Sequence, residues 1–219
     1  MKKTNPSKIR LVECNISLIP LDDDWLGEVK DVRDDFFKTL KKNPKKALKM
    51  VNALREKYPD FPPLSNWFIV ASGVTGLSEE ELGDLIENEY KKFPTYLYSR
   101  CNYAKLLLYR GEYEKVPEVF DNKYNLIDLY PDQDTFYAGD FVAFFSVLTQ
   151  YLSYKHDFDI VEKYLDILEE LAPNHPDVQD AHEVYFLELF NALQTHVSSK
   201  GKEKMVTKKV RNQKTVKSR

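Results

Sequence analysis

Four prolines close four similar stretches of this chain, and the spacing before them constrains the fold more than any other feature. Apolar residues precede Pro173 at steps of 4, 3 and 5 residues, at Val161, Leu165 and Leu168. The same steps recur, with one glutamate among the apolar positions, in Ala47, Val51, Leu54 and Pro59 and in Leu82, Ile86, Glu89 and Pro94. Steps of three and four are the period of an α-helix, which proline cannot continue. The pattern therefore predicts amphipathic helices that end near these prolines.

A fourth copy begins at Val116 and Phe120, and its proline, Pro131, comes three residues late. The closing prolines are therefore 35, 37 and 42 residues apart. A degenerate period of this size is typical of helical arrays, because one helix pair cannot bury its apolar face alone and packs on the next pair.

Helix-start signals agree with this division. Asn43 followed by Pro44 predicts a helix cap and a proline in the first turn. Ser78 and Glu81 have the spacing of a capping box. We also expect Ser65 to cap the helix that carries WFIVA.

The stretches RGEYEKVPEVF (110–120) and HDFDIVEKYLDILEELAP (156–173) resemble the tetratricopeptide repeat, with its Gly-Asp-Tyr-like turn, small residue and closing proline. The resemblance covers about residues 28–173. It implies an all-α fold: an α-solenoid of about four irregular helix pairs, stacked right-handedly, plus a C-terminal helix. Most first-helix signature residues of the family are absent, and Pro117 lies early in a second helix.

Three regions follow from this division of the chain. Residues 1–27 form an N-terminal segment in which CNISL alternates and predicts an extended conformation. Residues 28–197 form the repeat domain, which ends in the amphipathic helix PDVQDAHEVYFLELFNALQ (176–194). In that helix we expect Val184, Leu187, Ala192 and Leu193 to pack on the array. Both of its faces are partly apolar, so a partner or a second copy of the chain would cover the outer one.

Charge is unevenly distributed. The chain has a net charge of −3, and residues 200–219 contain nine Lys or Arg and one Glu, so this tail carries +8 and the remainder −11. The basic residues are Lys200, Lys202, Lys204, Lys208, Lys209, Arg211, Lys214, Lys217 and Arg219. Residues 198–219 are predicted to be disordered because they lack apolar periodicity.

The tail suggests contact with nucleic acid, a membrane surface or acidic partners. It has no aromatic residue for base stacking, so such binding would be independent of sequence and sensitive to salt. The alternative is a solvated tail that aids solubility or touches the acidic body of its own chain.

Catalytic and metal-binding patterns are not found. The four histidines lack the i, i+4 spacing of a zinc motif, and the two cysteines lack ligand neighbours. Asp22–Asp24 and Glu79–Glu81 precede or begin helices, where carboxylates complement the helix dipole. We therefore expect no cofactor, no metal and no enzyme activity, although a site assembled from distant residues stays open.

Without an apolar run of about 20 residues, the chain is expected to be cytoplasmic and to have no transmembrane segment.

The resemblance also implies a concave face, lined by the first helix of each pair, that takes up a peptide. The family's inward-facing spacing falls on Leu64, Trp67, Ala71, Tyr98, Cys101, Lys105, Ser146 and Gln150. Trp67 and Tyr98 would be the anchors of a bound peptide, unless both simply belong to the core. Asn102 matches one asparagine of the family's carboxylate clamp, but the other clamp positions do not match.

The sequence thus favours a non-catalytic adaptor that binds a protein or peptide. The main alternative is a nucleic-acid or ribonucleoprotein accessory factor that acts through the basic tail, and an enzyme with an unrecognised site comes third. In a further alternative, the apolar segment IRLVECNISLIPL (9–21) occupies the concave face of its own chain.

Overall fold

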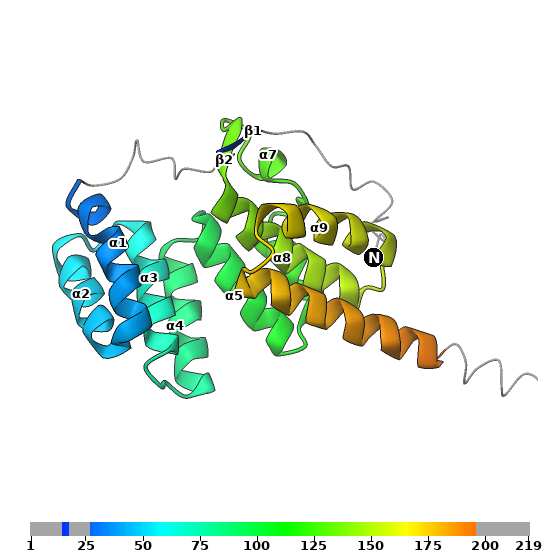
Figure 1. The fold of residues 1–219 in the computed structure, drawn as a ribbon, viewed down its shortest axis with the longest axis horizontal. Coiled ribbons are helices and arrows are strands. Elements are labelled where there is room, and N and C mark those ends of the chain that lie inside the picture. The colour runs from blue at the N-terminus through cyan, green and yellow to red at the C-terminus, as the bar shows by residue number, and fades with distance from the viewer. Residues whose placement is uncertain (1–14, 18–26, 196–219) are drawn as a thin grey trace, which may run out of the picture. The chain divides into compact units, whose positions relative to one another are not determined.

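The computed structural model describes residues 15–17 and 27–195, and these residues are mostly helical, as the sequence predicts (Figure 1). The helices are α1 (Gly27–Lys42), α2 (Pro44–Lys57), α3 (Pro62–Gly73), α4 (Glu79–Lys92), α5 (Leu97–Tyr109), α6 (Val116–Val119), α7 (Leu126–Leu129), α8 (Ala138–Tyr154) and α9 (Phe158–Leu171), with a 3-10 turn, η2 (Tyr113–Lys115), and a last helix over residues 176–195. From α1 to α6, each helix packs against the next one along the chain.

Two short strands join distant parts of the sequence. β1 (Asn15–Ser17) pairs in parallel with β2 (Thr135–Tyr137), with Ile16 opposite Phe136. The extended conformation expected for CNISL is therefore confirmed for residues 15–17, and the rest of the segment 9–21 lies outside the described residues. The chain divides into two compact units, Met1–Leu148 and Thr149–Arg219, with the border inside α8.

The four closing prolines follow helix ends at one fixed distance, because α2, α4, α7 and α9 all end two residues before their proline. After α2, Tyr58 leaves the helical region with φ −128° and ψ 66°, while its N–H still donates to the carbonyl of Leu54. A proline ring disfavours the helical conformation in the residue before it, so the helix ends there. Phe93, Tyr130 and Ala172 repeat this geometry.

The same tight turn follows each of these helix ends, with proline at its second position, where the fixed φ suits the turn. The N–H of the fourth turn residue donates to the carbonyl of the first in Phe61–Tyr58 (3.3 Å), Tyr96–Phe93 (3.2 Å), Gln133–Tyr130 (3.1 Å) and His175–Ala172 (2.9 Å). After α2, α4 and α9 a new helix begins directly, whereas the turn after α7 leads into β2.

The G-E-Y and H-D-F turns also share one backbone conformation. Gly111 and His156 both adopt the left-handed region, with φ 72° and φ 58°. In both turns this residue donates to the carbonyl three residues earlier, and the next N–H donates to the carbonyl five residues before it, at 2.8 and 3.0 Å. This is the helix ending that favours glycine, and the chain uses it after α5 and after α8.

The late position of Pro131 has a local cause. The segment that corresponds to one long second helix elsewhere is divided into η2, α6 and α7. Pro117 lies in the first turn of α6, and Asp121 and Asn122 separate α6 from α7 with φ 53° and 58°.

Two of the three expected helix caps are confirmed. The side chain of Asn43 accepts from the N–H of Lys46, and Ser78 and Glu81 form a complete capping box at the start of α4. The expectation for Ser65 is wrong, because α3 begins three residues earlier at Pro62 and encloses Ser65 as a buried residue. The two consecutive prolines supply fixed φ values and make that earlier start favourable.

The last helix runs antiparallel to α9. Tyr185 donates to Glu162 (2.7 Å), and further along the pair His182 contacts Glu169 (2.9 Å). Its buried residues are Val178, Ala181 and Tyr185. The expected packing of Leu187 and Leu193 is wrong, because both side chains are exposed, while Val184 and Ala192 are half-buried.

The core of α1, α2 and α3 contains an aromatic stack. The rings of Phe36 and Trp67 lie 4.7 Å apart and nearly parallel, and Phe37 meets Trp67 edge-on. Val29, Ala47, Val51, Leu64 and Ala71 complete this buried cluster.

Replacing Trp67 by alanine should lower the free energy of unfolding by about 3–5 kcal/mol, because it removes a large side chain that is only 3 % exposed. Urea denaturation followed by circular dichroism measures the change. Val70→Ala, on the exposed side of the same helix, is the matched control and should change stability by less than about 0.5 kcal/mol. A loss below 1 kcal/mol for Trp67→Ala would contradict its place in the core.

Candidate functional site

The residues predicted to line a concave face differ widely in exposure. Five of them are buried: Leu64, Trp67, Ala71, Cys101 and Ser146. The other three, Tyr98, Lys105 and Gln150, are half-buried. Asn102, the one residue matching the clamp, donates to the side chain of Asn66 (3.1 Å). In this structure most of the set therefore contributes to the interior, and uptake of a peptide by these residues stays a prediction.

Tyr98 belongs to a polar cluster where α5 meets the start of α8. Asp140 accepts hydrogen bonds from the hydroxyl of Tyr98 and from the N–H of Tyr137 (3.2 Å). Burial raises the pKa of Asp140 above its ordinary value of 3.8, although both hydrogen bonds oppose this shift. Burial and the neighbouring Asp140 carboxyl raise the pKa of Tyr98 well above 10. The pair is suited to fixing α8 and β2 against α5.

Gly139 shows how tightly this cluster is packed. A Cβ at this position would lie 2.5 Å from Cε1 of Tyr137 and 3.1 Å from the hydroxyl of Tyr98. Tyr96 and Tyr130 lie near the same carboxyl, and desolvation raises the pKa of each above 10.

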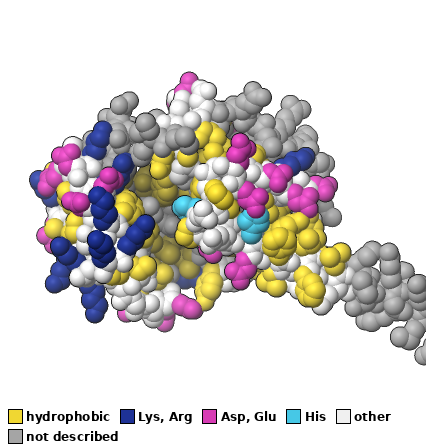
Figure 2. All heavy atoms as spheres, viewed as in Figure 1, with side chains coloured by type: hydrophobic (Ala, Val, Ile, Leu, Met, Phe, Trp, Pro, Cys, Tyr) yellow, Lys and Arg dark blue, Asp and Glu magenta, His cyan; other side chains and the backbone are white. Residues whose placement is uncertain are grey.

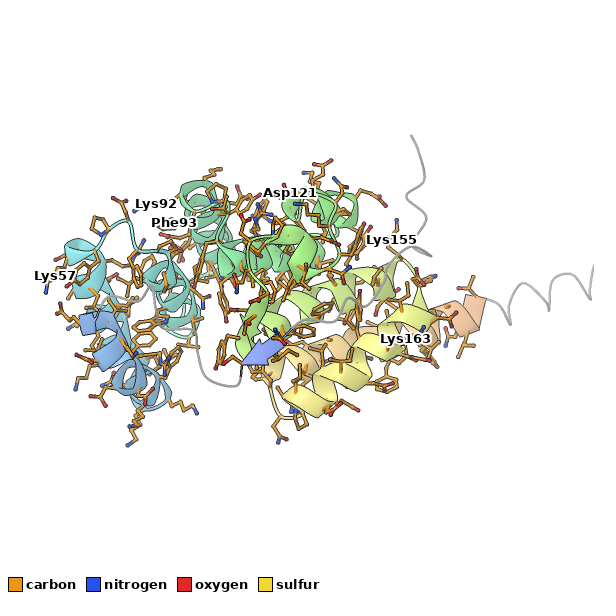
Figure 3. All side chains as sticks on the ribbon, turned by 90° about the horizontal axis from the view of Figure 1, so that it is seen from above. Lys57, Lys92, Phe93, Asp121, Lys155 and Lys163 are labelled. Atoms are coloured by element: carbon orange, nitrogen blue, oxygen red, sulfur yellow. The ribbon has the colours of Figure 1, made fainter. Side chains whose placement is uncertain are left out.

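A shallow pocket of about 310 Å³ lies between the ends of α2 and α4, lined by Asn52, Arg55, Glu56, Pro59 and Lys92. Its cations already have partners within the chain. Arg55 pairs with Glu89 and lies 3.8 Å from the centre of the Phe68 ring. Lys92 contacts Asp60 (3.6 Å) and lies 5.1 Å from the ring of Phe93 (Figure 3).

A different arrangement is found where α1 turns into α2. Six lysines and no acidic residue occur between positions 38 and 49, and we name this set the lysine corner: Lys38, Lys41, Lys42, Lys45, Lys46 and Lys49. All six are exposed, and within the described part of the chain none of them has an ion-pair partner. Figure 2 shows Lys and Arg side chains gathered where Figure 1 draws α1 and α2.

The lysine corner was not predicted, because positive charge was considered only in the tail (200–219). A signal was present, since α2 has Lys45 and Lys46 in its first turn and no acidic residue there. Lysines in that turn oppose the helix dipole, whereas α4 begins with Glu79, Glu80 and Glu81. The nine basic residues of the tail lie outside the described residues.

The last helix carries an apolar face that nothing in the described chain covers. We name it the apolar stripe: Phe186, Leu187, Phe190 and Leu193, which are 61, 56, 57 and 56 % exposed. Their steps of one, three and three residues place them on one side of a helix. Figure 2 shows hydrophobic side chains gathered on this helix.

Acidic residues accompany the apolar stripe. Between positions 164 and 199 the sequence contains seven Asp or Glu and no Lys or Arg. Glu188 lies beside the stripe and contacts His156 (3.3 Å), so one carboxylate there is already engaged. The surface therefore combines exposed apolar area with negative charge.

Metal binding and membrane crossing find no support in the described ranges. Within residues 15–17 and 27–195, no group of three or more His, Cys, Asp or Glu side chains is arranged to hold a metal ion. In the same ranges, none of the helices combines the length and apolar character needed to span a bilayer.

Comparison with known proteins gives no relative. The chain matches no family model, no curated protein and no solved structure.

The raised pKa of Asp140 predicts a pH-dependent stability. Because the unfolded carboxyl ionises near 3.8, stability should fall as pH rises from that value through the higher folded pKa. Asp140→Asn keeps an acceptor for Tyr98 but does not titrate. Urea titrations give the free energy of unfolding of both proteins. We expect the wild-type value minus the Asp140→Asn value to decrease as the pH rises above about 4. A difference that grows with pH would mean that the folded pKa is lowered.

The lysine corner predicts substitutions that stabilise the protein. Lys45→Glu and Lys46→Glu should each raise the free energy of unfolding by about 0.5 kcal/mol at low salt, since a carboxylate complements the start of α2. Lys49→Glu is the control beyond the first turn, and its smaller gain reports the change from lysine repulsion to Glu–Lys attraction without the helix-start contribution. Thermal unfolding at low and high ionic strength measures these changes. Equal gains for all three variants would exclude a contribution from the helix dipole.

Proposed function

We propose that this chain is a non-catalytic protein-binding module built as a tetratricopeptide-like helical array. Three observations support the array. Consecutive helices from α1 to α6 pack on one another. The turn after each closing proline is the same four times, and the left-handed helix ending recurs after α5 and α8. A repeated helix pair would produce the proline turn and the left-handed helix ending at corresponding positions along the chain.

The apolar stripe is the observation that carries the binding function. Its four large side chains are each more than half exposed, and they lie on one face of one helix. Single exposed hydrophobic residues need no explanation, but a contiguous apolar face is typical of an interaction site. The stripe, more than the mostly buried set around Trp67, is the surface on which a partner docks.

The chemistry around the stripe indicates its occupant. An amphipathic helix would offer apolar residues at the matching spacing, and it would bury the stripe along its length. Because no Lys or Arg lies between positions 164 and 199, the charged side chains of this stretch that could meet basic residues flanking that helix are carboxylates. The occupant is therefore a partner helix with an apolar face and basic edges.

A synthetic helical peptide tests this function with the full chain. The probe has leucines at positions i, i+3, i+4 and i+7 and lysines at the flanks, and a scrambled peptide of equal charge controls for simple attraction. We expect Phe190→Ala to weaken binding of the probe at least about tenfold, since burying one Phe contributes about 2 kcal/mol. Fluorescence polarisation measures the affinity.

Val74→Ala is the matched control, because Val74 lies in the other unit and is 56 % exposed. It should leave the affinity unchanged. Equal binding of the scrambled peptide, or equal loss in both variants, would refute the proposal. Light scattering gives the remaining outcome: a wild-type dimer that Phe190→Ala dissociates would show that a second copy, not a basic helix, occupies the stripe.

A further inference from the structure

The lysine corner holds positive charge that the described chain does not neutralise. Elsewhere in α1 to α4, cations are paired: Lys57 with Glu28, Arg55 with Glu89 and Lys92 with Asp60. On these helices, cations that lie near a carboxylate therefore form an ion pair with it. At the corner, six cations are exposed and lack such a partner among the described residues.

Several of these lysines also repel one another in the free protein. Lys38 and Lys42 are four residues apart on α1, and Lys45 and Lys49 are four apart on α2, so like charges face each other on both helices. The pairs on the two helices converge at the chain reversal around Asn43, because α1 packs directly on α2. A ligand that brings several negative charges would relieve all these repulsions together.

The residues around the lysine corner indicate which class of polyanion it binds: a protein, a membrane or a nucleic acid. Lysine is depleted in protein–protein interfaces, whose centres need apolar area. Membrane-surface helices need an extended apolar face toward the lipid. In α1 and α2 the only large hydrophobic side chain that is exposed is Phe37 (40 %), while Val29, Phe36, Ala47 and Val51 are fully buried. Binding to nucleic acid needs neither an apolar interface centre nor an apolar helix face, because Lys–phosphate contacts alone supply the sequence-independent affinity.

We infer that the lysine corner binds the phosphate backbone of a nucleic acid without reading its bases. Exposed lysines with free donors contact phosphate oxygens, and neutralised phosphates release their counterions. No aromatic side chain occurs between positions 38 and 49, and the neighbouring Phe37 packs edge-on against Trp67, so stacking on bases is not assigned to this site. The site is independent of the apolar stripe, which lies in the other unit and is acidic.

The test compares two variants of the full chain with the same change in net charge. The corner variant carries Lys42→Gln, Lys45→Gln and Lys46→Gln. The tail control carries Lys204→Gln, Lys208→Gln and Lys209→Gln. The probes are a labelled 20-nucleotide single-stranded RNA and a 20-base-pair DNA duplex, and fluorescence anisotropy is measured over a series of salt concentrations. Circular dichroism confirms that both variants are folded.

We expect the corner variant to bind the RNA at least about tenfold more weakly at low salt, and its salt slope to be smaller by about 2, since three contacts at about 0.7 each are lost. The tail control should lose less affinity than the corner variant. An equal or larger loss in the tail control would overturn the inference, because only net charge or the tail would then matter.

Two further arms separate the other polyanions. The same variants are tested for binding to phosphatidylserine vesicles and, separately, to a polyglutamate of matched charge. Tighter corner-dependent binding to either one than to both nucleic acids would overturn the inference in favour of a membrane or an acidic protein. Binding of RNA or DNA that exceeds both and depends on the corner supports it.

Discussion

The restriction that proline imposes on the preceding residue organises much of this fold. Tyr58, Phe93, Tyr130 and Ala172 are held outside the helical region, so four helices end at a fixed distance from their prolines. The turn that follows closes with the same hydrogen bond each time. A chain with few glycines thus obtains repeated reversals from proline, and its amphipathic helices are brought back onto one another.

Local signals in the sequence therefore predicted much of the helical structure. Helix ends, the caps at Asn43 and Ser78, and the short extended segment around Ile16 are determined by residues near in sequence. Ser65 was misassigned because two competing start signals lie within four residues, and the prolines of α3 determine the start. The pairing of β1 with β2 joins segments more than 100 residues apart, and no local pattern indicates it.

Exposure was harder to predict than secondary structure. In α3 and α5, buried residues occur on several sides of the helix, so periodicity does not identify an outer face. Trp67 has the size and polarity of a binding anchor, yet it stacks on Phe36, from a helix about 30 residues earlier. For the apolar stripe, the sequence predicted burial where the structure shows exposure. Its residue spacing fits core packing, but the last helix meets α9 through the side that carries Tyr185 and leaves Phe190 exposed.

The two surfaces proposed for binding would take ligands of opposite character. Carboxylates around the apolar stripe repel phosphate, and the lysine corner offers little apolar area to a partner helix. One ligand would therefore not satisfy both surfaces, and each would have its own selectivity. Because phosphate binding weakens steeply with salt while apolar burial does not, ionic strength would release a nucleic acid from the corner and leave a helix bound to the stripe.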